Sequence, residues 1–199
     1  MICCLDLEGV LMPEVWIHVA KKVRLKELEI TTRDEPDYDK LMKYRIGILK
    51  KEGIKLRDIQ KVIEKMDPLP GANGFLKKLK EKYQVIILSD TFYEFAGPMM
   101  KKLGGPTLFC NWLKTDAKGF ISGYHLRQKN GKEQAVRGIK NLGFSVVAAG
   151  DSYNDITMLK VADRGVLFRP PSKIVGEFPQ FPVTQNYKEL FTALVKASN

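Results

Sequence analysis

Carboxylate and hydroxyl side chains follow three short apolar runs in this chain, and they are the residues best suited to chemistry. The runs and their polar followers are 2–5 with Asp6 and Glu8, 85–88 with Ser89 and Asp90, and 146–149 with Asp151 and Asp155. Each run is typical of a buried strand. If the strands are parallel neighbours, their ends meet at the carboxyl edge of one sheet, where open α/β sheets bind ligands.

These acids predict a metal site. A cluster of Asp6, Glu8, Asp151 and Asp155 would repel itself unless a positive charge lay among its members. Mg²⁺ prefers oxygen ligands and binds through one or two carboxylates together with a substrate phosphate. Asp151 directly follows its strand and is the better ligand candidate, because Asp155 also suits the N-terminus of the next helix.

The elements that must position these residues alternate between strand and helix. Helical apolar spacing recurs at 71–83 and from Gly131 onward, which predicts an α/β fold with a Rossmann-like three-layer parallel sheet core. Residues 107–127 read as a hairpin with its turn at 116–119.

One helical stretch, 14–65, interrupts this alternation and is closed by two prolines. It predicts a small helical cap, 14–68, inserted after the first strand, with 1–13 and 69–199 forming the catalytic core. Such a lid excludes water and completes a site.

The charge and composition of the chain limit the kinds of molecule that it is expected to bind. The chain has 33 Lys and Arg against 23 Asp and Glu, a net charge of +10, which suits an anionic substrate and also nucleic acid. The bases are spread over helix surfaces without interleaved aromatic residues, so we expect no nucleic-acid partner, and an RNA-binding protein is the alternative outside the enzymes. No apolar run is long enough to span a bilayer, and three cysteines without a disulfide pattern indicate a reduced, cytoplasmic protein with no membrane partner.

The ordered motifs resemble those of the haloacid dehalogenase superfamily of phosphotransferases. They are Asp6-x-Glu8-Gly9, Ser89, Lys132 and Gly150-Asp151-x-x-x-Asp155. Within it the chain is similar to the phosphoserine phosphatases, most of all to the bacterial phosphoserine:homoserine phosphotransferase type, over essentially its whole length. The family usually has Asp where this chain has Glu8, and often Thr where it has Val10; the transferase type shares the Glu.

The resemblance implies phosphoryl transfer from phosphoserine through an aspartyl-phosphate on Asp6. It implies Mg²⁺ held by Asp6, Asp151 and the backbone carbonyl of Glu8, with Asp155 supporting the metal from behind its ligands. Glu8 is the implied general acid and base. The implied acceptor is water or the hydroxyl of homoserine. A phosphatase for another small phosphomonoester stays open, as does a homodimer.

Two residues contact the phosphoryl group in the implied site, Ser89 and Lys132. Ser89 also suits a helix cap. Lys132 stands in the first turn of a helix, where a cation is unfavourable unless it meets an anion, and Lys129 is its rival.

Four residues are the candidate contacts of the substrate. Glu14 and Arg45 match the family positions that bind its amino and carboxyl groups, and a carboxylate and a guanidinium suit these charges. Asp90 is expected beside the substrate, and Asn154 is expected to bind substrate or phosphate.

Overall fold

The molecule is built on one seven-stranded sheet. The computed structural model describes residues 1–31, 34–35 and 37–195. The sheet order is β4-β3-β2-β1-β5-β6-β7, and all neighbours are parallel except β3 and β4. The strands are β1 (Ile2–Leu5), β2 (Gln84–Phe92), β3 (Thr107–Thr115), β4 (Ile121–His125), β5 (Val146–Gly150), β6 (Arg164–Phe168) and β7 (Val183–Thr184). The three acid-bearing strands, β2, β1 and β5, are adjacent, as predicted.

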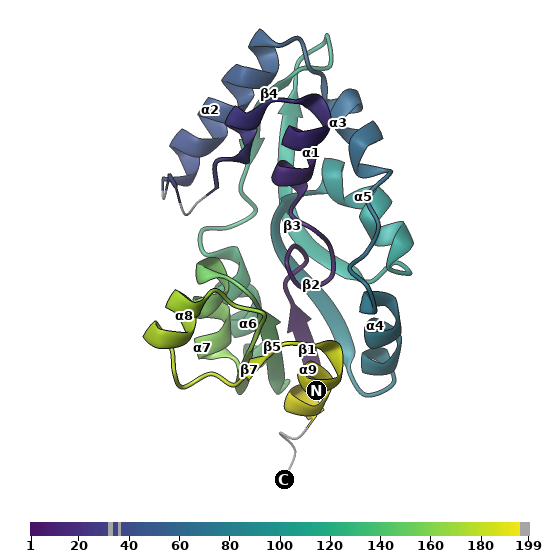
Figure 1. Ribbon diagram of the computed structural model, residues 1–199. Coiled ribbons are helices and arrows are strands. Elements are labelled where there is room, and N and C mark those ends of the chain that lie inside the picture. Colours follow the sequence, from purple (N-terminus) through teal and green to yellow (C-terminus); the bar gives the residue numbers. More distant parts are fainter. Residues whose placement is uncertain (32–33, 36, 196–199) are drawn as a thin grey trace.

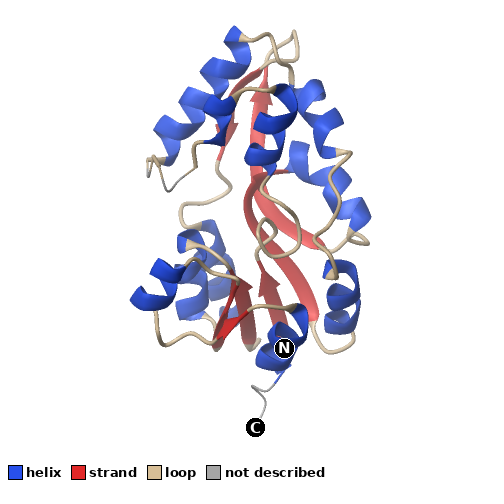
Figure 2. Cartoon of the chain, viewed as in Figure 1, coloured by secondary structure: helices blue, strands red, loops and turns tan. Residues whose placement is uncertain are grey.

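Helices cover both faces of this sheet (Figure 2). The helices are α1 (Val15–Val23), α2 (Tyr38–Lys51), α3 (Leu56–Ile63), α4 (Ala72–Lys80), α5 (Tyr93–Lys102), α6 (Gly131–Asn141), α7 (Ile156–Val161), α8 (Ser172–Glu177) and α9 (Tyr187–Val195), with short 3-10 helices at Lys26–Glu29 and Tyr153–Asp155. None of the described helices is long and apolar enough to cross a membrane.

Alternation along β1 divides the core into two layers. Cys3 and Leu5 belong to the apolar cluster under α4, α5 and α9, whereas Ile2 and Cys4 belong to the cluster under α6, α7 and α8. Successive side chains of a strand point to opposite faces, so a strand that is apolar throughout must be covered on both. The α/β three-layer fold is therefore confirmed, with β4 as an antiparallel edge strand.

The helices α1, α2 and α3 lie together beyond the carboxyl ends of the central strands (Figure 1). The β3–β4 hairpin reaches up to them: the rings of Tyr38 and Tyr124 meet edge to face at 5.7 Å, and the Tyr124 hydroxyl donates to Asp39 at 2.7 Å. Strand β4 of the hairpin thus packs against α2, one of the helices between β1 and β2. The division at 14 and 68 stays a prediction.

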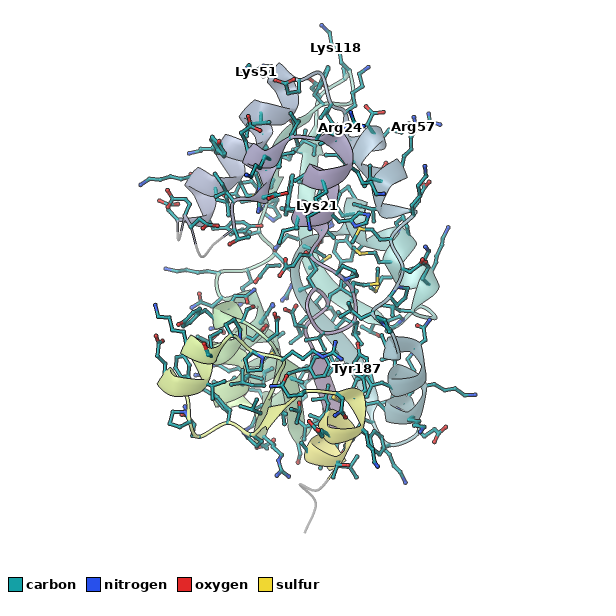
Figure 3. The ribbon with its side chains drawn as sticks, in the orientation of Figure 1. Lys21, Arg24, Lys51, Arg57, Lys118 and Tyr187 are labelled. Atoms are coloured by element: carbon teal, nitrogen blue, oxygen red, sulfur yellow. The ribbon has the colours of Figure 1, made fainter. Side chains whose placement is uncertain are left out.

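Tyr187 ties the C-terminal helix to the loop after β1 (Figure 3). Its hydroxyl donates to the carbonyl of Val10 at 2.7 Å, and its ring stacks on Phe75 and Phe168 at 4.9 and 5.0 Å. The first and last parts of the chain therefore support each other below the strand ends.

Candidate active site

Asp6 begins the loop that follows β1. It is buried, its backbone N–H donates to the carbonyl of Ala149 on β5, and its Oδ1 accepts the N–H of Leu7 at 2.7 Å. Gly9 then turns the loop with a φ of +79°, and a Cβ there would lie 2.5 Å from the Asp151 carboxylate. Glycine is required at this position for both the backbone angle and the close approach of Asp151.

Asp155 organises the second acidic loop, after β5. It is fully buried, and its Oδ2 accepts the backbone N–H groups of Asp151 at 2.9 Å and Ser152 at 3.1 Å. A Cβ on Gly150 would lie 2.3 Å from the Asp155 carboxylate, which explains the glycine. Asp155 therefore holds the loop that carries Asp151.

Lys132 joins these two loops. Its Nζ lies 2.9 Å from Asp6 Oδ1, 2.7 Å from Asp155 Oδ1 and 3.8 Å from Asp90 Oδ2. Burial by itself lowers the pKa of Lys132, but Asp155 and Asp6 outweigh it and hold that pKa well above its ordinary value. The exposed Lys129 lies outside the pocket lining, so the anions of this site meet Lys132.

The carboxylates around Lys132 outnumber this one cationic side chain. Oxygens of Asp6, Asp151 and Asp155 all lie within 4.8 Å of one another. Burial and the charges of Asp155 and Asp151 raise the pKa of Asp6 well above its usual range, and Lys132 offsets this only in part. A set of hard oxygen donors with excess negative charge fits a divalent cation such as Mg²⁺.

Glu8 faces the pocket from the loop after Asp6. Its Oε2 accepts the N–H of Val15, the first residue of α1, at 2.8 Å. Burial and the charge of Glu14 raise the pKa of Glu8 to about 7, against the opposing effects of the Val15 N–H, Thr91 and Arg45. A carboxyl group with this pKa can both donate and accept a proton near neutral pH.

Arg45 comes from α2 and is buried in the wall opposite the strand ends. Its Nη2 donates to the carbonyl of Ile30 at 2.7 Å, and its guanidinium lies 4.5 Å from the centre of the Trp16 ring. Burial lowers the pKa of Arg45 to about 10, so it stays protonated at neutral pH. Glu14, exposed at the start of α1, lines the same pocket.

Ser89 and Asp90 lie inside β2 and not after it, because β2 continues to Phe92 through a shift in its pairing with β3. The N-cap of α5 is Phe92, and Ser89 Oγ accepts the N–H of Thr91 at 3.2 Å. The helix-cap interpretation of Ser89 is therefore wrong. Asn154 Nδ2 donates to Asp90 Oδ2 at 2.7 Å and links β2 to the loop after β5.

These residues surround one pocket of about 350 Å³. All the predicted site residues line this pocket except Asp155. Asp155 lies outside the lining and holds the loop of Asp151 by accepting its backbone N–H. Sequence reasoning missed Trp16, Tyr38 and Thr91. Thr91 follows two predicted site residues and could have been found. Trp16 and Tyr38 carry no local signal, because an aromatic residue on a helix usually belongs to the core.

Many basic side chains point away from this pocket. Lys51, Arg57 and Lys118 are exposed and project from the upper helices and the hairpin turn (Figure 3). They are solvated charges on the outer surface and contribute no contact to the pocket lining.

The fold and the pocket at the carboxyl edge of the sheet define an α/β enzyme whose active site is built from carboxylate side chains. The chain belongs to the haloacid dehalogenase-like hydrolase family, which matches residues 2–163. The family resemblance read from the motifs is thus confirmed.

Curated relatives and solved structures agree with this family. This chain is 54% identical over 198 residues to a phosphoserine phosphatase of Pseudomonas syringae. The alignment covers the whole of this chain and 84% of that protein. This chain is 53% identical to phosphoserine phosphatase ThrH of Pseudomonas aeruginosa, with the whole chain aligned to 97% of that protein. The structure of a phosphoserine phosphatase in apo form superimposes with a TM-score of 0.79 at 22% identity, covering 97% of this chain and 98% of that one, which shows the shared fold.

Proposed function

We propose that this enzyme is a Mg²⁺-dependent phosphoserine phosphatase that acts through an aspartyl-phosphate intermediate and can pass the phosphoryl group to homoserine. The observation that carries the proposal is the pairing of buried Asp6 with Lys132 beside Glu8, on the floor of a pocket whose wall bears Arg45. Two relatives of more than 50% identity that are named phosphoserine phosphatase support it. A solved structure described as a phospho-aspartyl intermediate analogue of phosphoserine phosphatase shares the fold, with a TM-score of 0.78.

The chemistry begins with Asp6. Its carboxylate attacks phosphorus, the bond to the serine oxygen breaks, and an acyl phosphate forms on Asp6. Glu8, with a pKa of about 7, gives its proton to the departing alkoxide. Glu8 then takes the proton of water or of the acceptor hydroxyl, which attacks the phosphoryl group and regenerates Asp6.

Charge on the phosphoryl group is balanced by Lys132 and by the Ser89 hydroxyl in this proposal. Asp6, Asp151 and the backbone carbonyl of Glu8 would hold Mg²⁺, with Asp155 bracing the loop of Asp151; when bound, the ion neutralises phosphoryl oxygens. Asp155 keeps both Lys132 and the Asp151 loop in place through its two oxygens.

Substrate recognition is assigned to the opposite wall. Arg45 binds the carboxylate of phosphoserine, Glu14 its ammonium group, and Asp90 and Asn154 close the side of the pocket. In the interior of the fold, the buried free thiols of Cys3, Cys4 and Cys110 support the expectation of a reducing cytoplasm. A homodimer stays a prediction that light scattering can check.

The experiment is turnover of phosphoserine by the purified protein. Free phosphate and phosphohomoserine are measured with Mg²⁺, with and without homoserine, and after chelation of the metal. A panel of small phosphomonoesters is run in parallel. Higher kcat/KM for an ester without an amino-acid group, or undiminished turnover after chelation, would contradict the proposal.

A further inference from the structure

Trp16 stands between the pocket and the apolar core. It is in the first turn of α1, two residues after Glu14, and lines the pocket. Phe95 of α5 meets its ring edge to face, with centres 5.6 Å apart and an interplanar angle of 74°. The indole is thus packed against the core while it contacts the guanidinium of Arg45.

Arg45 has few protein partners for a buried guanidinium. It carries five N–H donors, of which Nη2 donates to the carbonyl of Ile30. Among residues 1–31, 34–35 and 37–195, no acceptor reaches its buried Nε–H. A buried donor without an acceptor is costly, and because this Nε is closed off from solvent, a ligand in the pocket can meet Arg45 only through its terminal nitrogens.

Stacking on an aromatic ring can hold the Arg45 guanidinium in place while its N–H donors stay available for hydrogen bonds. A carboxylate partner would occupy the in-plane N–H groups and compete with the substrate. An aromatic ring instead attracts the guanidinium through its face, which leaves the in-plane edge of the cation available. The contact at 4.5 Å between Arg45 and Trp16 is of this kind.

We propose that Trp16 is a positioning residue for carboxylate recognition: its indole holds the Arg45 guanidinium, with Nη2 fixed by Ile30, so that the remaining donors meet the carboxylate of the substrate. This inference rests on the proposed use of the pocket for phosphoserine. It makes Trp16, through Arg45, a determinant of the preference for phosphorylated amino acids over phosphomonoesters that lack a carboxylate.

The test compares two substrates that differ in one group. Phosphoserine carries the carboxylate and phosphoethanolamine lacks it. Trp16→Leu should raise KM for phosphoserine roughly three- to thirty-fold, the range of a cation–π contact from exposed to desolvated settings. It should leave kcat for phosphoserine and both constants for phosphoethanolamine within about two-fold. Trp16→Phe keeps an aromatic face and should restore most of the affinity.

The matched control is Trp112, the second tryptophan. It lies on β3 outside the pocket lining, with its ring 5.3 Å from that of Tyr93. Trp112→Leu should change neither substrate. If Trp16→Leu does not fold by circular dichroism, Trp16→Met replaces it, because Met fills a similar space without an aromatic face.

A double-mutant cycle separates positioning from general packing. In an Arg45→Ala background, Trp16→Leu should have no further effect on KM for phosphoserine, because the residue through which it acts is gone. Additive losses, equal losses on both substrates, or an unchanged KM in Trp16→Leu would each overturn the inference while an active wild type upholds the proposed function. A wild type that turns over phosphoethanolamine and not phosphoserine would overturn both.

Discussion

Asp6 lies among more acids than Lys132 can neutralise, and its place beside that lysine makes it the proposed nucleophile. Asp6→Asn should abolish turnover, because the amide cannot form an acyl phosphate. Its fold should persist, and its Tm without metal should be no lower than that of the wild type, since one buried, mutually repelling carboxylate is removed. Phosphate release and circular dichroism check this. A folded Asp6→Asn protein with wild-type turnover would exclude Asp6 as nucleophile.

Glu8 is one of two residues, with Val10, at which this chain leaves the common family pattern. Glu8→Gln should lose about 10²–10⁴-fold in turnover, the usual contribution of a general acid and base. Glu8→Asp should keep hydrolysis to within roughly ten-fold, since one methylene changes binding by about 1–3 kcal/mol.

The longer side chain of Glu8 should matter most for the acceptor. Its carboxyl reaches further towards the helices above the sheet, where an acceptor hydroxyl would replace the departed serine. Glu8→Asp should therefore lower the ratio of phosphohomoserine to free phosphate when both amino acids are supplied. A ratio equal to that of the wild type would show that the acceptor is selected elsewhere in the pocket.

At the scale of elements, α9 holds the loop after β1 through Tyr187. Tyr187→Phe removes its hydrogen bond to the Val10 carbonyl and keeps the stacking on Phe75 and Phe168. The free energy of unfolding should fall by about 0.5–1.5 kcal/mol. Tyr187→Ala also loses the stacked ring and should cost more, up to about 3 kcal/mol, because the ring is half-buried and fully buried aromatic residues lose about 3–5 kcal/mol. Urea unfolding measures both, and equal losses would show that the ring contributes nothing.

Asp163 connects α6, β5 and the turn before β6. Its carboxylate pairs with Lys140 at 2.6 Å and accepts the N–H of Val146 at 2.7 Å, and these contacts lower the pKa of Asp163. Because the pKa of Asp163 is lower in the folded than in the unfolded protein, its ionised carboxylate stabilises the fold at pH values above the unfolded pKa of about 3.9. This stabilisation is lost as the pH falls through the folded pKa. Asp163→Asn should thus lower Tm at pH 7, with the difference shrinking below about pH 4.

The ion pair of the exposed Asp67 with the half-buried Lys102 is the control for this pH dependence. Asp67→Asn should leave Tm nearly unchanged at pH 7, because exposed pairs contribute little. A Tm difference for Asp163→Asn that stays constant from pH 7 to pH 3 would contradict the electrostatic explanation.

The whole molecule has a net charge of +10, yet it gathers the carboxylates of Asp6, Asp151 and Asp155 in one small region. Binding of Mg²⁺ there should stabilise the entire fold. At about 100 times its dissociation constant the ion adds about 2.7 kcal/mol. For a chain of this size that raises Tm by roughly 5–10 °C. Thermal denaturation with and without Mg²⁺ checks this without any substrate.

Asp151→Asn is the matched variant for the metal experiment, since it removes one oxygen ligand and keeps the shape of the side chain. It should lose most of the Mg²⁺-dependent rise in Tm. The same rise in both proteins would place the ion outside the acidic loops.

The sequence by itself determined the ends of β1 and β5 and the order of the acids along the chain. Apolar runs, turns and helical spacing are local signals, so the neighbours Asp6, Ser89 and Asp151 could be predicted from strand polarity alone. The preference for Lys132 over Lys129 followed from the family resemblance, because Lys132 matches the family's position at the start of this helix better. The extent of β2 could not be predicted from local signals, because its pairing with β3 shifts after Leu88 and carries Ser89 and Asp90 inside the strand.

Only the tertiary structure decided which side chains meet above the strand ends, and that the β3–β4 hairpin joins the helices there. Helical spacing shows which face of a helix is buried, but not which element buries it. Arg45 meets Trp16 and the carbonyl of Ile30 across 29 and 15 residues of chain. The β3–β4 hairpin joins the helices through Tyr124 and Asp39, 85 residues apart. Such contacts depend on the packing of the whole chain, and they shape the wall of the pocket that is proposed to choose the substrate.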